Sequence, residues 1–144
     1  MDWKGAVQDI QGACDFLHSK GAQKVGVVGF CMGGALSLAA SVLVNGLHAS
    51  APFYGIPSKD LADPAKVRTP LQCHFGRKDT LKGFSDPEAQ DALEKTLNEV
   101  KANYEFFRYD ADHAFANDSG PKYDKEACEL AHGRVVEFFK KQLH

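Results

Sequence analysis

A cysteine stands between two glycines at the point where an apolar run gives way to small residues. Residues 24–34 read KVGVVGFCMGG, so that Cys31 has Gly29 two positions before it and Gly33 two positions after it. This is the spacing of a G-x-S-x-G nucleophile elbow, with a thiol in place of the usual hydroxyl. The nucleophile of such an elbow occupies a strained turn, so the residues two positions away are expected to be small. Cys31 is therefore predicted to be a nucleophile, the alternative being a small buried residue in a glycine-rich turn.

A helix is predicted to begin directly after Cys31, and the N–H groups of its first turn can stabilise negative charge near the thiol. The unpaired N–H groups and the dipole of a helix N-terminus favour the reactive thiolate form of a cysteine. The N–H of Met32 can donate a hydrogen bond to the negative oxygen that develops when a carbonyl carbon is attacked. Met32 is therefore the predicted oxyanion donor.

A thiolate nucleophile works with a histidine base, and the histidine needs a carboxylate that orients it. Where a G-x-S-x-G elbow is used, the chain order is nucleophile, acid, histidine. Asp79 follows the segment HFGRK and His113 follows YDAD, so both come after predicted strands and in the required order. Asp79 and His113 are the predicted acid and base. The alternatives are a solvated aspartate in a turn and a loop histidine bonded to backbone.

Other residues compete for these two roles. The rival acids are Asp86, Asp110 and Asp112. Asp112 is adjacent to His113 in the sequence, and neighbouring side chains rarely point at each other, which leaves Asp110 as the stronger rival. The remaining histidines lie in predicted helices, in or before strands, or at the C-terminus, and are weaker candidates for the base. They are His18, His48, His74, His132 and His144.

The segments around these residues alternate between helix and strand. Apolar residues at helical spacing predict helices, and short β-branched apolar runs predict buried parallel strands. Asp86 precedes Pro87 as a plausible helix N-cap. The predicted order is helix 5–19, strand 24–30, helix 32–44, strand 48–55, a loop with at most one helical turn over 56–69, a strand and loop over 70–79, helix 87–101, strand 104–110, loop 111–123 and helix 124–142.

This alternation is typical of a parallel sheet with helices on both faces. In such sheets, functional sites collect at the carboxyl ends of the strands. Cys31, Tyr54, Asp79 and His113 all follow predicted strands and are expected to meet at that edge.

Composition narrows the class of protein. The 144 residues suit one domain over 1–144, and 44% apolar with 25% charged residues is ordinary for a soluble globular protein. A net charge of −2 without blocks of like charge argues against nucleic acid or an anionic membrane as the main partner. No apolar run reaches the roughly 18 residues of a membrane span. The N-terminus does not read as a signal peptide, which predicts a cytoplasmic protein, or an organellar one if a transit peptide was removed.

Four cysteines are present, without C-x-x-C pairs or zinc-finger spacing, and are predicted to be thiols in a reducing compartment. Besides Cys31, each lies on an apolar helix stripe or strand face and is predicted to be a core residue. These three are Cys14, Cys73 and Cys128.

The sequence resembles the dienelactone hydrolase family of the α/β-hydrolase superfamily over essentially its whole length. The resemblance is carried by GFCMGG at 29–34, PFYG at 52–55, HFGRKD at 74–79 and DHAFAND at 112–118. It implies a three-layer α/β/α fold with a mostly parallel sheet. It also implies hydrolysis of small esters or lactones through a thioester intermediate, without a metal or organic cofactor. The residue roles that it implies are nucleophile Cys31, acid Asp79, base His113, oxyanion donor Met32 and substrate contacts Tyr54 and Phe115.

The sequence departs from the family in two respects. Family members are typically longer, and their N-terminal part holds the first strands, a second oxyanion N–H, a Glu beside the resting thiol and an Arg for the substrate carboxylate. This chain begins at the helix before the nucleophile strand, so a truncated α/β-hydrolase fold is expected. In addition, Asn117 stands where well-studied members carry a further Arg, which bears on the recognition of a carboxylate-bearing dienelactone.

Two alternative interpretations follow from the short chain. One is a catalytically weak hydrolase-fold subunit that acts as an interaction or assembly module. A second copy or a partner subunit would then cover the sheet edge and apolar surface that the missing strands leave exposed. The other is a fragment of a complete enzyme.

Overall fold

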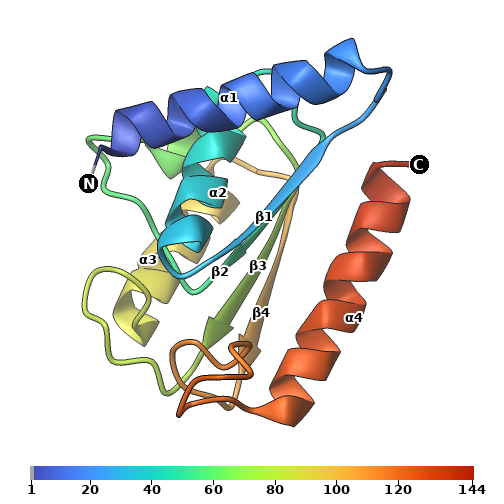
Figure 1. Ribbon diagram of the computed structural model, residues 1–144. Helices are drawn as coiled ribbons and strands as arrows, with labels where there is room; N and C mark the ends of the chain where they lie inside the picture. Colours follow the sequence, from blue (N-terminus) through green and yellow to red (C-terminus); the bar gives the residue numbers. More distant parts are fainter. Residues whose placement is uncertain (1) are drawn as a thin grey trace.

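The computed structural model describes residues 2–144, in which helices and strands alternate along the chain (Figure 1). Every helix and strand predicted from the sequence is present, with ends that agree to within a few residues. The single helical turn expected in the loop over 56–69 is the 3₁₀ turn η1. The elements are α1 (Trp3–Ser19), β1 (Gly26–Phe30), α2 (Met32–Leu43), β2 (Ala49–Phe53), η1 (Pro64–Lys66), β3 (Leu71–Gly76), α3 (Pro87–Glu99), β4 (Tyr104–Tyr109) and α4 (Lys125–Gln142).

The four strands form one parallel sheet in the order β1-β2-β3-β4. Each crossover steps in the same direction across the sheet, and right-handed crossovers in one direction place their connecting helices on one face. The crossover helices α2 and α3 accordingly lie on one side of the sheet, where α1 packs against α2, and α4 covers the other side (Figure 1). The predicted three-layer α/β/α arrangement with a parallel sheet is confirmed.

The two central strands are buried at every position, as expected for strands covered on both faces. The edge strand β1 is different, because Val28 and Phe30 each remain 41% exposed. The three cysteines predicted as core residues, Cys14, Cys73 and Cys128, are all buried, and burial raises the pKa of each of these thiols.

A row of rings crosses the sheet on the face that α4 covers. The ring of Phe53 lies 4.6 Å from that of Phe30 and 4.4 Å from that of His74, measured between centroids. His74 is fully buried, and its Nδ1 and Nε2 lie 2.8 Å from the Tyr109 hydroxyl and from Gln72 Oε1. Burial, with the nearby positive charge of Arg134, lowers the pKa of His74 to about 3. His74 is therefore a neutral structural residue.

Three of the long helices begin at an aspartate whose carboxylate accepts a hydrogen bond from a first-turn N–H. These N-caps are Asp2, Asp86 and Asp124. The helix α2 is the exception, since its N-cap is Cys31, whose side chain makes no capping hydrogen bond. Within residues 2–144, no helix is both long and apolar enough to cross a membrane.

Candidate active site

Cys31 occupies a strained turn between β1 and α2. Its backbone angles are φ 60° and ψ −118°, a combination that residues with a side chain rarely adopt. Two hydrogen bonds fix this conformation: the Cys31 N–H donates to the Phe53 carbonyl, and the Cys31 carbonyl accepts from Ala35 N–H. As a result the thiol stands at the exposed carboxyl edge of the sheet.

The glycines around the turn differ in whether a larger residue would fit in their place. A Cβ added to Gly29 would lie 2.0 Å from the Gly33 carbonyl oxygen and 2.4 Å from Ser37 Oγ, so a small residue is required there. At Gly33, by contrast, an added Cβ would meet nothing within 4 Å, and the expectation that this position must be small is wrong. The second constraint lies one residue later, where a Cβ on Gly34 would approach the Phe53 carbonyl oxygen to 2.0 Å.

The three residues predicted as nucleophile, base and acid lie in hydrogen-bonding contact. His113 Nε2 lies 3.0 Å from Cys31 Sγ, and His113 Nδ1 lies 2.8 Å from Asp79 Oδ2. The thiol follows β1, the carboxylate follows β3 and the imidazole follows β4, so the parallel sheet brings together residues that lie 82 and 34 positions apart. This is the geometry of a nucleophile, a base and an orienting acid.

The carboxylate of Asp79 is enclosed by donors. Its side chain is fully buried, with Oδ1 accepting from Leu81 N–H and Oδ2 facing His113. Burial acts to raise the pKa of Asp79, but hydrogen bonds from His113, Leu81 N–H and the Ser85 hydroxyl hold it below its ordinary value. Asp79 is thereby kept as an anion, the form that orients an imidazole and stabilises its positive charge.

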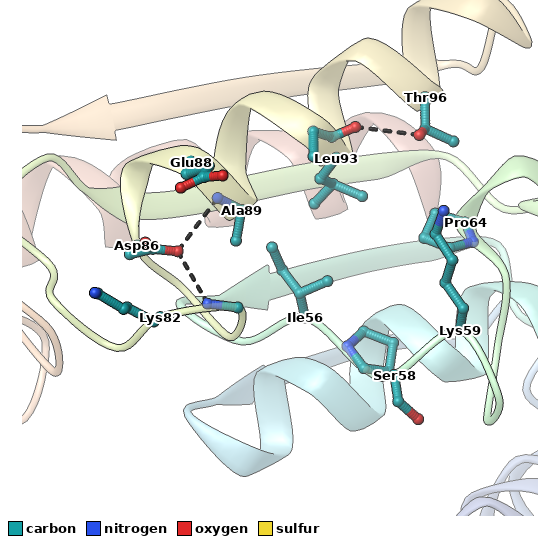
Figure 2. A pocket seen from close by; sticks show the side chains of 13 residues that line it. Ile56, Ser58, Lys59, Pro64, Lys82, Asp86, Glu88, Ala89, Leu93 and Thr96 are labelled. Atoms are coloured by element: carbon teal, nitrogen blue, oxygen red, sulfur yellow. Dashed lines mark hydrogen bonds between the residues drawn. The ribbon is translucent and has the colours of Figure 1, made fainter.

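The rival acid Asp86 has another role. Its Oδ1 accepts from the N–H groups of Gly83 and Ala89, which caps α3 and closes the preceding loop. Figure 2 shows this carboxylate on the wall of a cavity of about 490 Å³ that contains no residue of the Cys31–His113–Asp79 group.

The other two rival acids also bind elsewhere. Asp110 is exposed and pairs with Lys78 at 3.6 Å. Asp112 Oδ1 accepts from the backbone N–H of His113 at 2.6 Å and lies 3.5 Å from Lys122 Nζ. Asp112 thus contacts the main chain of His113, while Asp79 contacts its ring.

Two of the remaining histidines make structural contacts, and a third lines the cavity beside the thiol. The two ring nitrogens of His18 lie 2.8 Å from the carbonyl oxygens of Ala22 and Gly46, which tie the end of α1 to the loop after α2. His74 is buried in the sheet. His132, on α4, lines the same cavity as Cys31.

That cavity has a volume of about 670 Å³ and lies between the end of β1, the loop after β4 and α4. Tyr54 lines it and also packs edge-on against the His113 ring, with centroids 5.0 Å apart. Burial raises the pKa of Tyr54 to about 12, so the phenol stays neutral. Phe115 is fully buried behind Tyr54 and is not part of the cavity wall, and its contact with substrate stays a prediction.

Met32 is the first residue of α2, so its N–H has no partner within the helix. It lies directly after the strained turn at Cys31, and its role as an oxyanion donor stays a prediction. Within the described residues 2–144, no group of three or more His, Cys, Asp and Glu side chains is placed to hold a metal ion.

Sequence reasoning missed two buried polar residues beside the acid, Ser85 and Gln90. Ser85 Oγ lies 3.2 Å from His113 Nδ1, and Gln90 donates to the Ser85 carbonyl. The segment SDP at 85–87 reads as the start of a helix, which accounts for Asp86 and hides the second use of Ser85.

The sheet, the elbow and the order of the three residues are those of the α/β-hydrolase fold, and solved structures agree. A crystal structure from Klebsiella pneumoniae superimposes with a TM-score of 0.80 at 23% identity, covering 93% of this chain and 60% of that one. The Pyrococcus furiosus esterase Pf2001 superimposes with a TM-score of 0.74 at 18% identity, covering 96% of this chain and 62% of that one.

Sequence comparison identifies the family. The model of the dienelactone hydrolase family matches residues 2–143. Carboxymethylenebutenolidase 1 of Cupriavidus pinatubonensis is 31% identical over 144 residues, which cover 95% of this chain and 58% of the relative. The chain therefore belongs to the dienelactone hydrolase family. It spans about half the length of the curated relatives that it matches, from 40% to 60%.

Proposed function

We propose that the protein hydrolyses small esters or lactones, with Cys31 as nucleophile, His113 as base and Asp79 as orienting acid. The contact between Cys31 Sγ and His113 Nε2, with Asp79 on the opposite ring nitrogen, is the observation that carries the proposal. Family membership supports the reaction class, because the matching family is named for the hydrolysis of a lactone.

The reaction has two halves. The thiol proton passes to His113 Nε2, and the Cys31 thiolate attacks the carbonyl carbon to form a tetrahedral oxyanion, to which Met32 N–H donates. The imidazolium then gives its proton to the departing alcohol oxygen, which leaves a thioester on Cys31. Water attacks the thioester, His113 accepts the proton of that water and returns it to sulfur, and the carboxylic acid departs. Asp79 stabilises the imidazolium in each half.

The wall of the cavity indicates which substrates suit the site. Its charged side chains are those of Asp118 and Glu129, and its other lining is largely apolar, including Phe30, Tyr54 and Cys128. A wall that carries negative charge repels anionic acyl groups and tolerates neutral ones. Small uncharged esters are therefore the substrates of choice for a first test.

The test is hydrolysis of p-nitrophenyl acetate, followed by release of p-nitrophenol. Cys31→Ala and His113→Ala are each expected to lower kcat by about 10³-fold or more, because either change removes a member of a group that acts as a unit. Cys14→Ser is the matched control, since it replaces a buried thiol of α1 outside the site and is expected to leave turnover unchanged. Turnover in Cys31→Ala equal to that of the wild type would exclude the proposed mechanism, and a wild type without turnover would exclude the enzyme.

A second candidate function, an interaction or assembly module, is supported by a different observation. The edge strand β1 leaves Val28 and Phe30 exposed. Exposed apolar side chains along an unpaired strand are typical of a surface that another polypeptide covers.

A further inference from the structure

Ser85 differs from the other buried serines of this protein in what its hydroxyl binds. Ser37, Ser41 and Ser50 each donate to a main-chain carbonyl oxygen, those of Gly33, Leu38 and Ser37. The fully buried Ser85 instead places its Oγ 3.2 Å from His113 Nδ1 and within hydrogen-bonding reach of the Asp79 carboxylate. Its hydroxyl therefore has two side-chain neighbours, and both belong to the proposed catalytic group.

The chemistry of these three groups fixes the direction of each hydrogen bond. The Asp79 carboxylate can only accept, so the Ser85 hydroxyl donates its proton to it. The His113 Nδ1 proton points at Asp79 Oδ2 at 2.8 Å, with Ser85 Oγ as a weaker second acceptor. This arrangement holds the proton on Nδ1 and leaves Nε2 as the basic nitrogen that faces Cys31.

The backbone of Ser85 is also held in place. Its N–H donates to the Leu81 carbonyl at 3.0 Å. Its carbonyl accepts from Gln90 Nε2 at 2.8 Å, and the same amide nitrogen donates to the Gly76 carbonyl at the end of β3 at 2.9 Å. Gln90 therefore fastens the loop that carries Ser85 to the strand that precedes Asp79.

The amide of Gln90 is oriented in turn from β4. Arg108 Nε donates to Gln90 Oε1 at 3.2 Å, which leaves the NH₂ group of Gln90 directed at the two carbonyls. Arg108 is itself held by Glu94 at 2.7 Å and by Asp91 at 3.1 Å. On the other side of the loop, the cap made by Asp86 fixes Gly83 to α3 (Figure 2). The loop over 81–86 is thus anchored on both sides.

We infer that Ser85, held by Gln90, is a positioning residue that orients Asp79 and the His113 ring toward Cys31. This role rests on the proposed function of the site. It predicts that loss of the Ser85 hydroxyl loosens the orientation of Asp79 and of the His113 ring, so that Nε2 is less well aimed at Cys31, without touching the surface that binds substrate.

The experiment measures the reactivity of Cys31 directly, so that it needs no hydrolysed substrate. Alkylation by iodoacetamide at pH 6 is followed by mass spectrometry of the peptide that contains Cys31. Because a hydrogen bond to a charged group is lost, Ser85→Ala is expected to slow this alkylation about tenfold. Ser85→Thr, which keeps the hydroxyl, is expected to restore most of the rate. Ser41→Ala, which removes an equally buried hydroxyl from α2, is expected to react as the wild type does.

A parallel measurement uses the acylation step with p-nitrophenyl acetate. Ser85→Ala is expected to lower the acylation rate constant about tenfold at an unchanged burst amplitude, whereas general destabilisation lowers the amplitude and leaves the rate constant of the folded molecules unchanged. Wild-type alkylation of Cys31 in folded Ser85→Ala would overturn the inference. If circular dichroism shows that Ser85→Ala does not fold, Gln90→Leu is tested in its place. The inference then requires that Gln90→Leu slows the alkylation of Cys31 and that Ser85→Thr does not.

The two proposals fail in different ways. If the wild type does not hydrolyse esters but its Cys31 alkylation depends on Ser85 as described, the proposed hydrolase function is contradicted and the positioning role is supported. If the wild type hydrolyses esters but substitution of Ser85 or Gln90 changes neither alkylation nor acylation, the positioning role is contradicted and the hydrolase function is supported.

Discussion

At the scale of single residues, the distance between the first turn of α2 and the neighbouring strand decides which glycine of the elbow can be replaced. The adjacent Gly33 and Gly34 both begin α2, yet only Gly34 would drive a Cβ into the Phe53 carbonyl. Gly34→Ala is expected to destabilise the protein by about 3 kcal/mol, the cost of forcing atoms into a packed interior. Gly33→Ala is expected to leave stability unchanged or raise it by up to ~1 kcal/mol, because alanine favours helix. Urea unfolding at neutral pH measures both.

The two substitutions are matched controls for each other, since they add the same methyl group to neighbouring residues of the same helix. Equal loss of stability in Gly33→Ala and Gly34→Ala would contradict the geometry described for this turn. Ester hydrolysis by Gly33→Ala then shows whether the position two residues after the nucleophile must be small for another reason, such as access of substrate.

At the scale of secondary-structure elements, His74 links β3 to β2 through stacking on Phe53 and to β4 through a hydrogen bond with Tyr109. Its pKa falls from the ordinary 6.5 to about 3 in the folded protein, so the unfolded chain binds a proton first as the pH decreases. The free energy of unfolding is therefore expected to decrease below pH 6.5, by about 1.4 kcal/mol per pH unit from this group, until about pH 3. Urea unfolding at pH 7, 6 and 5 measures this slope.

The matched variant is His74→Gln, which keeps hydrogen-bonding capacity but does not titrate. It is expected to be less stable at pH 7 and to lose less stability between pH 7 and pH 5 than the wild type. The lowered pKa of Asp79 acts in a separate range, because the stability that its carboxylate contributes is lost only as the pH falls below its ordinary value of 3.8. An identical slope in His74→Gln would show that His74 is not the titrating group.

At the scale of the whole molecule, the open edge of β1 is the feature that bears on assembly. The Val25 carbonyl and the Cys31 N–H bond toward β2, so in a parallel ladder the alternate residues Val28 and Phe30 turn their backbone groups to the free edge. An uncharged strand edge with exposed apolar side chains pairs readily with another chain. The wild type is expected to self-associate with rising concentration, and Val28→Lys is expected to shift it toward monomer by sedimentation velocity.

Val100→Lys is the control, because Val100 is also 41% exposed but lies at the end of α3, away from the edge. It is expected to associate as the wild type does. A wild type that stays monomeric at all concentrations would contradict this prediction, and equal effects of the two substitutions would assign the association to general hydrophobicity.

The secondary structure, the candidate site residues and the family could be predicted from the sequence alone. Short β-branched apolar runs predicted the strands, and apolar residues at helical spacing predicted the helices. The chain order of Cys31, Asp79 and His113 predicted which three side chains meet at the sheet edge. The resemblance of four short segments identified the family, which the comparisons confirm. The helices, strands and family segments were accessible because each depends on residues that are close together in the chain, and the three site residues were accessible because each follows such a strand.

The tertiary structure decided what depends on distant segments meeting. It separated Asp79 from Asp86, Asp110 and Asp112, since only contact between the ends of β3 and β4 shows which carboxylate reaches the His113 ring. It moved the steric constraint from Gly33 to Gly34, because the obstacle is the carbonyl oxygen of Phe53 on the neighbouring strand. It also placed Ser85 beside the acid. No local pattern encodes these contacts, because each is fixed by the register and packing of elements that are remote in sequence.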